Sequence, residues 1–321
     1  MAGPEPSRLT QALDGLSPKG KPPASARILN AWITQAQDTL GVAGSRLGWL
    51  VAATVVSAAL QRAVDGTGSP MFLLKGGTML QYRLPGISRA TQDIDGLIHG
   101  DIDQFLTALD QMLDDPWGPL TLVRGEVETI QVPHRLVKPR RFDVTVLLKG
   151  VTWRRIQVEI APDEGSAGAE PEPIPSPSLA GFGLPTPDGL MGLSMRYQIA
   201  QKVHACTDPH DPPAYINDRP RDVVDLLLLR DFIAVTGTPT LAEVRHAIED
   251  VFAHRAEEAL ATGGALRAWP TSLTAHEHWG PSFGRATESA GLSISLTDAV
   301  AQVNSWLEQV EHESALEPPT H

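Results

Sequence analysis

Two aspartates separated by one residue, Asp93 and Asp95, are the first side chains whose spacing suggests chemistry. The apolar sequence around them predicts a strand over residues 94–99, and in a strand residues i and i+2 point to the same face. Two converging carboxylates repel each other unless a cation lies between them, so Mg²⁺, or Mn²⁺ in its place, is the expected occupant. An isolated Asp-x-Asp is also common at an exposed strand edge or in a turn.

A third carboxylate would strengthen the prediction of a metal site, and two candidates are present. Glu159 lies in the strand-like sequence IQVEI, flanked on both sides by apolar residues, where an acid is not expected without a partner. Asp143 begins another strand-like sequence next to Arg140 and Arg141, so an ion pair would explain it. We therefore expect Glu159 to be the third metal ligand and keep Asp143 as the alternative.

A glycine-rich turn precedes the aspartates. The apolar sequence MFLL runs through Lys75 into Gly76, Gly77 and Thr78, which open a predicted helix. Glycine lets the backbone approach a ligand closely, and the N–H groups of a helix start, with the Thr78 hydroxyl, can bind a phosphate. A simple tight turn explains the same residues.

A second group of charged residues lies further along the chain. Lys202 belongs to the helical sequence YQIAQKVHACTD and could bind a phosphate as a point charge. Asp222 and Asp225 are three residues apart, so they share one face of a predicted helix. This pair could accept hydrogen bonds from a substrate hydroxyl, or could form salt bridges with Lys202, Arg219 or Arg221.

Overall charge argues against a generic nucleic-acid-binding protein, because the formal net charge of the 321 residues is −12. Cations are nevertheless concentrated in one segment. We predict that this segment contacts an RNA backbone, although a solvated hairpin face explains it equally well. The candidate RNA-binding residues are Arg135, Lys138, Arg140, Arg141, Arg154 and Arg155.

The order of the predicted elements favours an α+β fold. Helical and strand-like segments alternate up to about residue 165, and helical periodicity follows from about residue 191. We expect a catalytic core with a mixed sheet and N-terminal helices over 26–165, a linker over 166–188 and a helical domain over 189–310. The polar, Pro-rich ends, 1–25 and 311–321, are expected to be disordered tails.

Cys206 is the only cysteine, which fits a reducing cytoplasm. Neither a signal peptide nor a membrane span is expected, and the apolar segment from Leu47 to Leu60 predicts a buried helix. Metal binding is not predicted for His204 and its neighbours up to Asp211, because helix geometry does not bring them together, nor for His276 and His278, which have no clear third ligand. Asp101-Ile102-Asp103 repeats the Asp-x-Asp pattern, but a helix N-cap explains it better.

In combination, three segments resemble the nucleotidyltransferase toxins of the AbiEii/AbiGii family. The first runs from the Gly-Gly-Thr turn to the aspartate pair, the second is the helix with Lys202, and the third is the sequence RPRDVVDLLLL. The matching residues are Gly76, Gly77, Thr78, Arg89, Thr91, Asp93, Asp95, Lys202, Arg219, Asp222 and Asp225. The resemblance covers roughly residues 70–310.

The resemblance implies a fold related to DNA polymerase β and metal-dependent transfer of a nucleoside monophosphate from an NTP to an acceptor. Members act as toxins of type IV-like toxin–antitoxin pairs, and several modify the 3′ end of tRNA. The expected catalytic residues are Asp93, Asp95, Lys202 and Asp222; the expected nucleotide-binding residues are Lys75, Gly76, Gly77, Thr78, Arg89, Thr91 and Asp225; the expected metal ligands are Asp93, Asp95 and Glu159.

For this chain we therefore expect a cytoplasmic toxin that modifies an RNA, with the tRNA 3′ end as the first choice, and inhibits translation. An antitoxin encoded nearby is its expected partner, and no membrane partner is expected. Two alternatives stay open. The chain could bind NTP and act without transfer, or it could transfer the nucleotide to a hydroxyl of a protein or a small molecule.

Overall fold

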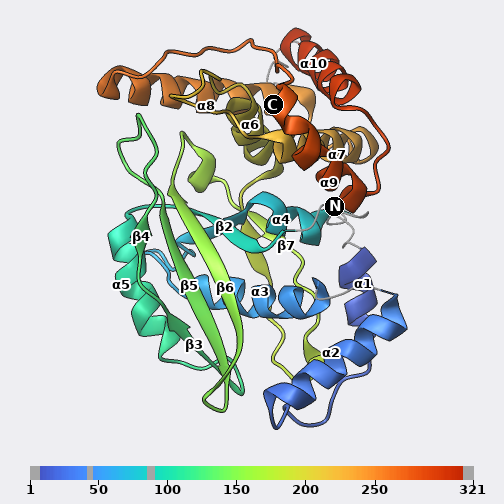
Figure 1. Cartoon of the computed structure of the whole chain (residues 1–321). Helices are drawn as coiled ribbons and strands as arrows, with labels where there is room; N and C mark the ends of the chain where they lie inside the picture. Colours follow the sequence, from blue (N-terminus) through green and yellow to red (C-terminus); the bar gives the residue numbers. More distant parts are fainter. Residues whose placement is uncertain (1–7, 42–45, 85–90, 314–321) are drawn as a thin grey trace, which may run out of the picture.

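The computed structural model describes residues 8–41, 46–84 and 91–313 (Figure 1). Its strands form one eight-stranded sheet in the order β3-β5-β6-β2-β1-β8-β7, with β4 paired to β5 beside this path. The strands are β1 (Phe72–Lys75), β2 (Asp93–Ile98), β3 (Leu120–Arg124), β4 (Glu128–Thr129), β5 (Arg140–Leu148), β6 (Val151–Pro162), β7 (Glu172–Ile174) and β8 (Leu190–Gly192).

Helices precede, interrupt and follow these strands. The α-helices are α1 (Arg8–Asp14), α2 (Ala26–Leu40), α3 (Arg46–Leu60), α4 (Gly76–Arg83), α5 (Ile102–Leu113), α6 (Met195–Cys206), α7 (Pro220–Thr236), α8 (Leu241–Thr262), α9 (Gly280–Ala290) and α10 (Leu296–His312). Three short 3₁₀ turns are η1 (Ala167–Ala169), η2 (Ala180–Phe182) and η3 (Glu277–Trp279).

Strand β2 lies in the middle of the sheet. It runs parallel to β6 and antiparallel to β1. The register places Asp95 directly between Glu159 of β6 and Lys75 of β1. Because residues opposite each other on neighbouring strands present their side chains to the same face, the fold collects these three charges on one face of the sheet.

The two faces of the sheet differ in polarity. In β5 the buried residues Phe142, Val144 and Val146 alternate with the partly exposed residues Arg141 and Asp143. Helix α3 packs against β5 and β6, and α5 packs against β3. The apolar face is therefore the core face, and the alternating residues leave the opposite face open for polar groups.

The apolar sequence of α3 forms a helix that is buried at nearly every position, as predicted. Helix α5 begins as predicted too, since the Asp101 side chain accepts a hydrogen bond from the Gln104 amide and caps the helix. In the described part of the chain, no helix combines the length and the apolar character needed to cross a membrane.

The second half of the chain is helical. Helix α6 packs against α7 and α8, and α7 packs against α9 and α10. Figure 1 shows these helices gathered beyond one end of the sheet, while α2 lies at the opposite end of the molecule. The predicted fold class, an α+β fold with a mixed sheet followed by a helical region, is confirmed.

Two segments that composition predicts to be irregular contain structure. In the N-terminal segment Leu13 is fully buried, and the Asp14 carboxylate accepts a hydrogen bond from the Ser178 amide. The expected linker contributes β7, which pairs with β8 at the edge of the sheet. Pro173 argues against a strand in the sequence, but an edge strand tolerates a proline.

Helix α9 forms within the expected helical domain, although its sequence has a low helix propensity. Gly280, Pro281 and Gly284 lower its helix propensity. Pro281 stands in the first turn, where its missing N–H group costs no hydrogen bond. Phe283 and Ala290 are buried one above the other on the face that packs against α7, so tertiary packing stabilises the helix.

Candidate active site

The carboxylates of Asp93 and Asp95 project from the same face of β2. Burial raises the pKa of Asp95 to about 6, and the nearby charges of Asp93 and Glu159 add to that shift while Lys75 opposes it. A partly buried carboxylate crowded by two other acids keeps its charge more easily when a cation compensates it. The predicted convergence of Asp93 and Asp95 therefore has the electrostatics of a cation site.

Glu159, and not Asp143, stands beside Asp95 in the sheet. Its carboxylate accepts hydrogen bonds from Nε of Arg141 at 2.8 Å and from the Gln157 amide at 3.2 Å. Asp143 lies opposite Gln157 and approaches Arg155 at 3.8 Å, so an ion pair explains its presence, but with Arg155 and not with the adjacent Arg140 or Arg141.

The residues present fit a metal ion in part. Carboxylate oxygens are the preferred ligands of Mg²⁺, and Asp93 and Asp95 supply them from one strand face. Within residues 8–41, 46–84 and 91–313, no three His, Cys, Asp or Glu side chains are grouped closely enough to hold a metal ion by themselves. The aspartate pair can share a metal with substrate phosphates, while Oε1 of Glu159 is already bonded to Arg141.

The Gly-Gly-Thr turn packs directly against the aspartates. Gly76 has a φ angle of 67°, and a Cβ atom on it would lie 2.2 Å from Oδ2 of Asp95. The Thr78 hydroxyl donates to the carbonyl oxygen of Asp93 at 2.8 Å and thereby ties α4 to β2. Gly77 and Thr78 are buried behind Gly76, so only Gly76 of the three faces the cavity described below.

We expect Gly76→Ala to reduce any activity that depends on Asp95 by at least about tenfold. The added methyl group would displace the Asp95 carboxylate, and the left-handed backbone would cost about 1–2 kcal/mol of folding stability. Gly68→Ala is the matched control, because Gly68 has a φ of 85° and open space around it. That control should lose similar stability and keep its activity. Wild-type activity in Gly76→Ala would contradict the assigned close contact.

Two glutamines of α6 contact this turn and were missed by the sequence reasoning. The carboxamide oxygen of Gln198 accepts from the Gly76 amide at 3.1 Å, and that of Gln201 accepts from Nζ of Lys75 at 3.5 Å. Burial lowers the pKa of Lys75. Both glutamines precede Lys202 on the same helix, and the spacing of 198 and 202 by one helical turn was the available signal.

The second predicted group forms around Lys202. Its ammonium donates to Oδ1 of Asp222 and to Oδ2 of Asp225, both at 2.7 Å. The two aspartates share one face of α7, as their spacing predicts, and the Asp225 side chain is fully buried. The salt-bridge interpretation therefore holds for this pair, with Lys202 as the partner. Lys202 and Asp222 line the cavity, whereas Asp225 lies behind them.

Two further predicted residues lie just before β2. The Thr91 hydroxyl donates to Oδ1 of Asp93 at 2.8 Å and so orients that carboxylate. Arg89 lies outside the described residues. The Trp49 indole donates to the carbonyl oxygen of Gln92 at 3.1 Å and anchors the start of the strand to α3.

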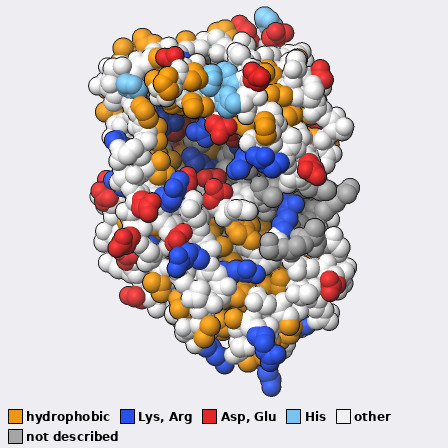
Figure 2. Space-filling view, in the orientation of Figure 1, with side chains coloured by type: hydrophobic (Ala, Val, Ile, Leu, Met, Phe, Trp, Pro, Cys, Tyr) orange, Lys and Arg blue, Asp and Glu red, His pale blue; other side chains and the backbone are white. Residues whose placement is uncertain are grey.

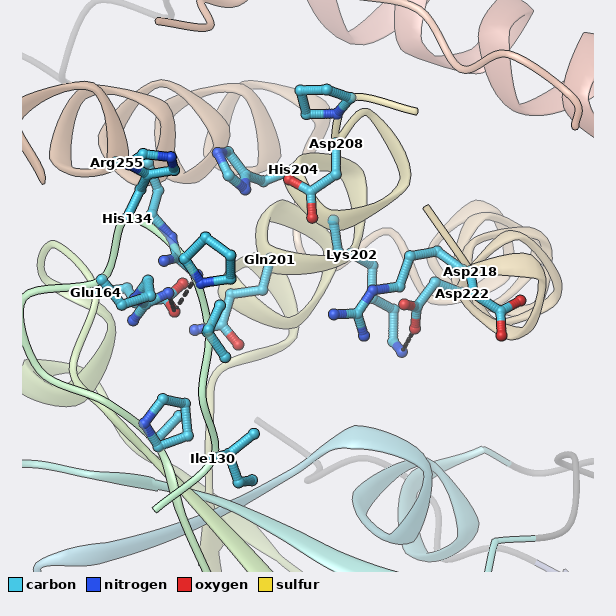
Figure 3. A pocket seen from close by; sticks show the side chains of 18 of the residues that line it. Ile130, His134, Glu164, Gln201, Lys202, His204, Asp208, Asp218, Asp222 and Arg255 are labelled. Atoms are coloured by element: carbon cyan, nitrogen blue, oxygen red, sulfur yellow. Dashed lines mark hydrogen bonds and ion pairs between the residues drawn. The ribbon is translucent and has the colours of Figure 1, made fainter. Parts of the chain in front are cut away.

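A cavity of about 1020 Å³ joins the two groups. Lys75, Gly76, Asp93, Asp95 and Glu159 line its sheet side, and Figure 3 shows Lys202, Asp218 and Asp222 on one side with Ile130, His134 and Glu164 across from them. In Figure 2 a hollow with mixed positive and negative side chains opens on this face, with histidines at its rim. Seven Lys or Arg and nine Asp or Glu residues line the cavity, so a polyanionic nucleotide would need additional cations there.

The predicted RNA-binding cations do not form one surface. Arg135 is buried in salt bridges with two glutamates of the cavity wall. Arg154 lies opposite Val146 on the core face, where its guanidinium contacts α3. Arg141 and Arg155 are on the open face but are paired with acids. The remaining two bond locally: Lys138, in the loop before β5, donates to Gln131, and Arg140, the first residue of β5, donates to the Lys138 carbonyl oxygen.

The histidines are engaged in local contacts. His204 is buried beside Arg267, and burial together with that cation lowers the pKa of His204 to about 3. The rings of His210 and His278 stack with centroids 4.8 Å apart, and the His276 ring lies tilted against His210 at 4.3 Å. These contacts join distant segments, which is why the sequence did not show them.

A family model described as "Nucleotidyl transferase AbiEii toxin, Type IV TA system" matches residues 58–293. The chain belongs to this family. The match spans every element that lines the cavity, from the Gly-Gly-Thr turn through β2 and α6 to α9, and it confirms the resemblance seen in the three sequence motifs. The chain is thus a nucleotidyltransferase toxin of the type IV toxin–antitoxin class, and this class implies a cognate antitoxin.

One solved structure shares the fold of the chain. MenT4, a nucleotidyltransferase toxin of Mycobacterium tuberculosis H37Rv, is similar with a TM-score of 0.54 and 18% identity over 91% of each chain. JHP933 of Helicobacter pylori is similar with a TM-score of 0.38 and 17% identity, over 83% of this chain and 95% of that one. No curated protein sequence compared with the chain matches it.

Proposed function

We propose that the chain transfers a nucleoside monophosphate from an NTP to a hydroxyl of an RNA acceptor, the 3′ end of tRNA, and thereby inhibits translation. One observation carries the proposal: residues of all three motifs, including Asp93, Asp95, Lys202 and Asp222, line a single cavity. Carboxylates on one wall and a lysine on the other suit an in-line displacement at phosphorus, in which catalysis consists of positioning and charge stabilisation.

The proposed cofactor is Mg²⁺, or Mn²⁺ in its place. Asp93 and Asp95 would hold it, and Glu159, in register with Asp95, is the proposed third ligand. The ion would neutralise phosphate charge and lower the pKa of the attacking hydroxyl. The excess of acids over Lys and Arg in the cavity lining supports the need for such an ion.

The other residues bind and orient the substrates. Gly76 provides the space for phosphate oxygens next to Asp95, and Thr78 and Thr91 hold Asp93 in place. Lys202 and Lys75 neutralise charge on the departing pyrophosphate. Transfer breaks the bond between the α and β phosphates and forms an ester to the acceptor oxygen. The hydroxyl proton passes to Asp222, the base of this proposal.

Incubation of the chain with total tRNA, Mg²⁺ and each of the four NTPs, followed by 3′-end sequencing, tests the acceptor. We expect added nucleotides at tRNA 3′ ends, and none when EDTA removes the metal. Unmodified RNA would leave two alternatives, transfer to a protein or small-molecule hydroxyl, or NTP binding without transfer. Labelling of a cell extract separates these two. The proposed compartment is the cytoplasm, where tRNA is available.

A further inference from the structure

Two arginines of the cavity wall, Arg219 and Arg221, differ from the other arginines that line it. Arg135, Arg255 and Arg267 each form salt bridges with acids of the same wall. Arg219 and Arg221 are exposed and make no salt bridge with any described residue. An anion can therefore bind to Arg221 without breaking a salt bridge, whereas at Arg219 it joins the nearby charges of Asp222 and Asp208.

Arg219 and Arg221 stand at the start of α7, where burial of the Arg219 guanidinium is outweighed by the charges of Asp222 and Asp208, which raise its pKa. Arg219 is the N-cap residue, without a side-chain capping bond, and Arg221 lies in the first turn. The positive end of the helix dipole disfavours a cation there by about 0.3–1 kcal/mol. Asp222 follows directly and contacts Lys202, so the two arginines border the reacting end of the cavity.

The cavity has room for a second substrate. Its volume of about 1020 Å³ is at the upper end of the range of roughly 300–1,000 Å³ that is typical for one small ligand. A nucleotide held between the aspartates and Lys202 would leave the part beside the start of α7 open. The second substrate of a nucleotidyltransferase is its acceptor.

An aromatic surface lies next to the two arginines. His278 is exposed, stacks on His210 and bonds through Nε2 to the carbonyl oxygen of Asn217, two residues before Arg219. Proteins that hold single-stranded nucleic acid combine cations for the phosphates with rings on which unpaired bases stack. Guanidinium groups also match phosphate geometry better than ammonium groups do.

We propose that Arg219 and Arg221 bind the phosphates of a single-stranded RNA end, with His278 as the ring on which an unpaired base stacks. This inference rests on the proposed function for the role of that RNA as acceptor. It places the acceptor site at the start of α7 and not on the β5–β6 surface that the basic sequence segment predicts.

The test measures binding of a fluorescent single-stranded RNA with a free 3′ hydroxyl to the full chain, without NTP, across a salt series. We expect Arg221→Glu to weaken binding at least about tenfold and Arg221→Ala to lower the salt slope by about one. His278→Ala should weaken binding by several-fold. Arg27→Glu, on the distant and exposed face of α2, is the charge-matched control and should bind like the unmodified chain (Figure 1). A non-hydrolysable NTP should bind equally well to Arg221→Glu.

Wild-type RNA affinity in Arg221→Glu would overturn the inference. It would also be overturned if only Arg155→Glu lost RNA binding, because the RNA would then bind to the β5–β6 surface. If the unmodified chain does not bind RNA, the inference is overturned too. This holds even if the chain transfers nucleotides to a protein. If RNA binding depends on Arg221 but no nucleotide is transferred, the inference stands and the proposed function fails.

Discussion

Replacing Asp93 by alanine is expected to lower nucleotide transfer on the order of 10³-fold or more, equivalent to about 4 kcal/mol of transition-state stabilisation. Asp93 is one of two carboxylates that share a face of β2, and Asp95→Asn should have a similar effect. Neither change should destabilise the fold, because each removes a negative charge from a crowded group of acids. Transfer rates and thermal melting curves of the purified variants measure both effects.

Asp103→Asn is the matched control for this pair. Asp103 belongs to the other Asp-x-Asp sequence of the chain, but it lies in the first turn of α5, away from the cavity. We expect unchanged transfer in this variant. Near-normal transfer by Asp93→Ala would refute the assignment of the site, whereas a large drop in its melting temperature would mean that the aspartate is structural.

The second large effect is expected for Lys202→Ala. This change leaves the fully buried Asp225 and the nearly buried Asp222 without their shared ammonium group. Removing one partner of a buried ion pair costs about 3–5 kcal/mol, so denaturant unfolding should show a loss of that size. Transfer should also fall strongly, because Lys202 is the cation proposed to meet the departing pyrophosphate.

A double variant separates the two roles of Lys202. Adding Asp225→Asn to Lys202→Ala removes the buried uncompensated charge, so a large part of the lost stability should return. Activity should not return with it. Recovery of transfer together with stability would show that Lys202 acts only by holding the helices α6 and α7 together.

Local patterns predicted the part of the site that depends on spacing within one element. Asp93 and Asp95 lie on one face of their strand, as the two-residue repeat of a strand requires. Asp222 and Asp225 lie on one face of their helix, as the 3.6-residue repeat of a helix requires. Glu159 was preferred over Asp143 because an acid within an apolar strand needs a partner, and the sheet register does place Glu159 beside Asp95.

Contacts between segments that are distant in the sequence could not be predicted from these local patterns. The partners of Arg135, Glu164 and Glu258, are 29 and 123 residues away in the sequence, so its burial could not be foreseen from a cluster of basic residues. Gln198 was missed for the same reason, because its bond to Gly76 joins two separate elements. Strand β7 was not predicted because it contains a proline, which usually argues against a strand but is tolerated at a sheet edge.

The most direct test of nucleotidyl transfer is to follow the two ends of the NTP separately. With Mg²⁺ and total tRNA, label in the α phosphate should appear on RNA, and label in the γ phosphate should leave as pyrophosphate. Both signals should vanish with EDTA and in Asp93→Ala. Retention of the γ label on RNA, or equal α labelling by Asp93→Ala, would contradict the assignment of this cavity as a nucleotidyltransferase site.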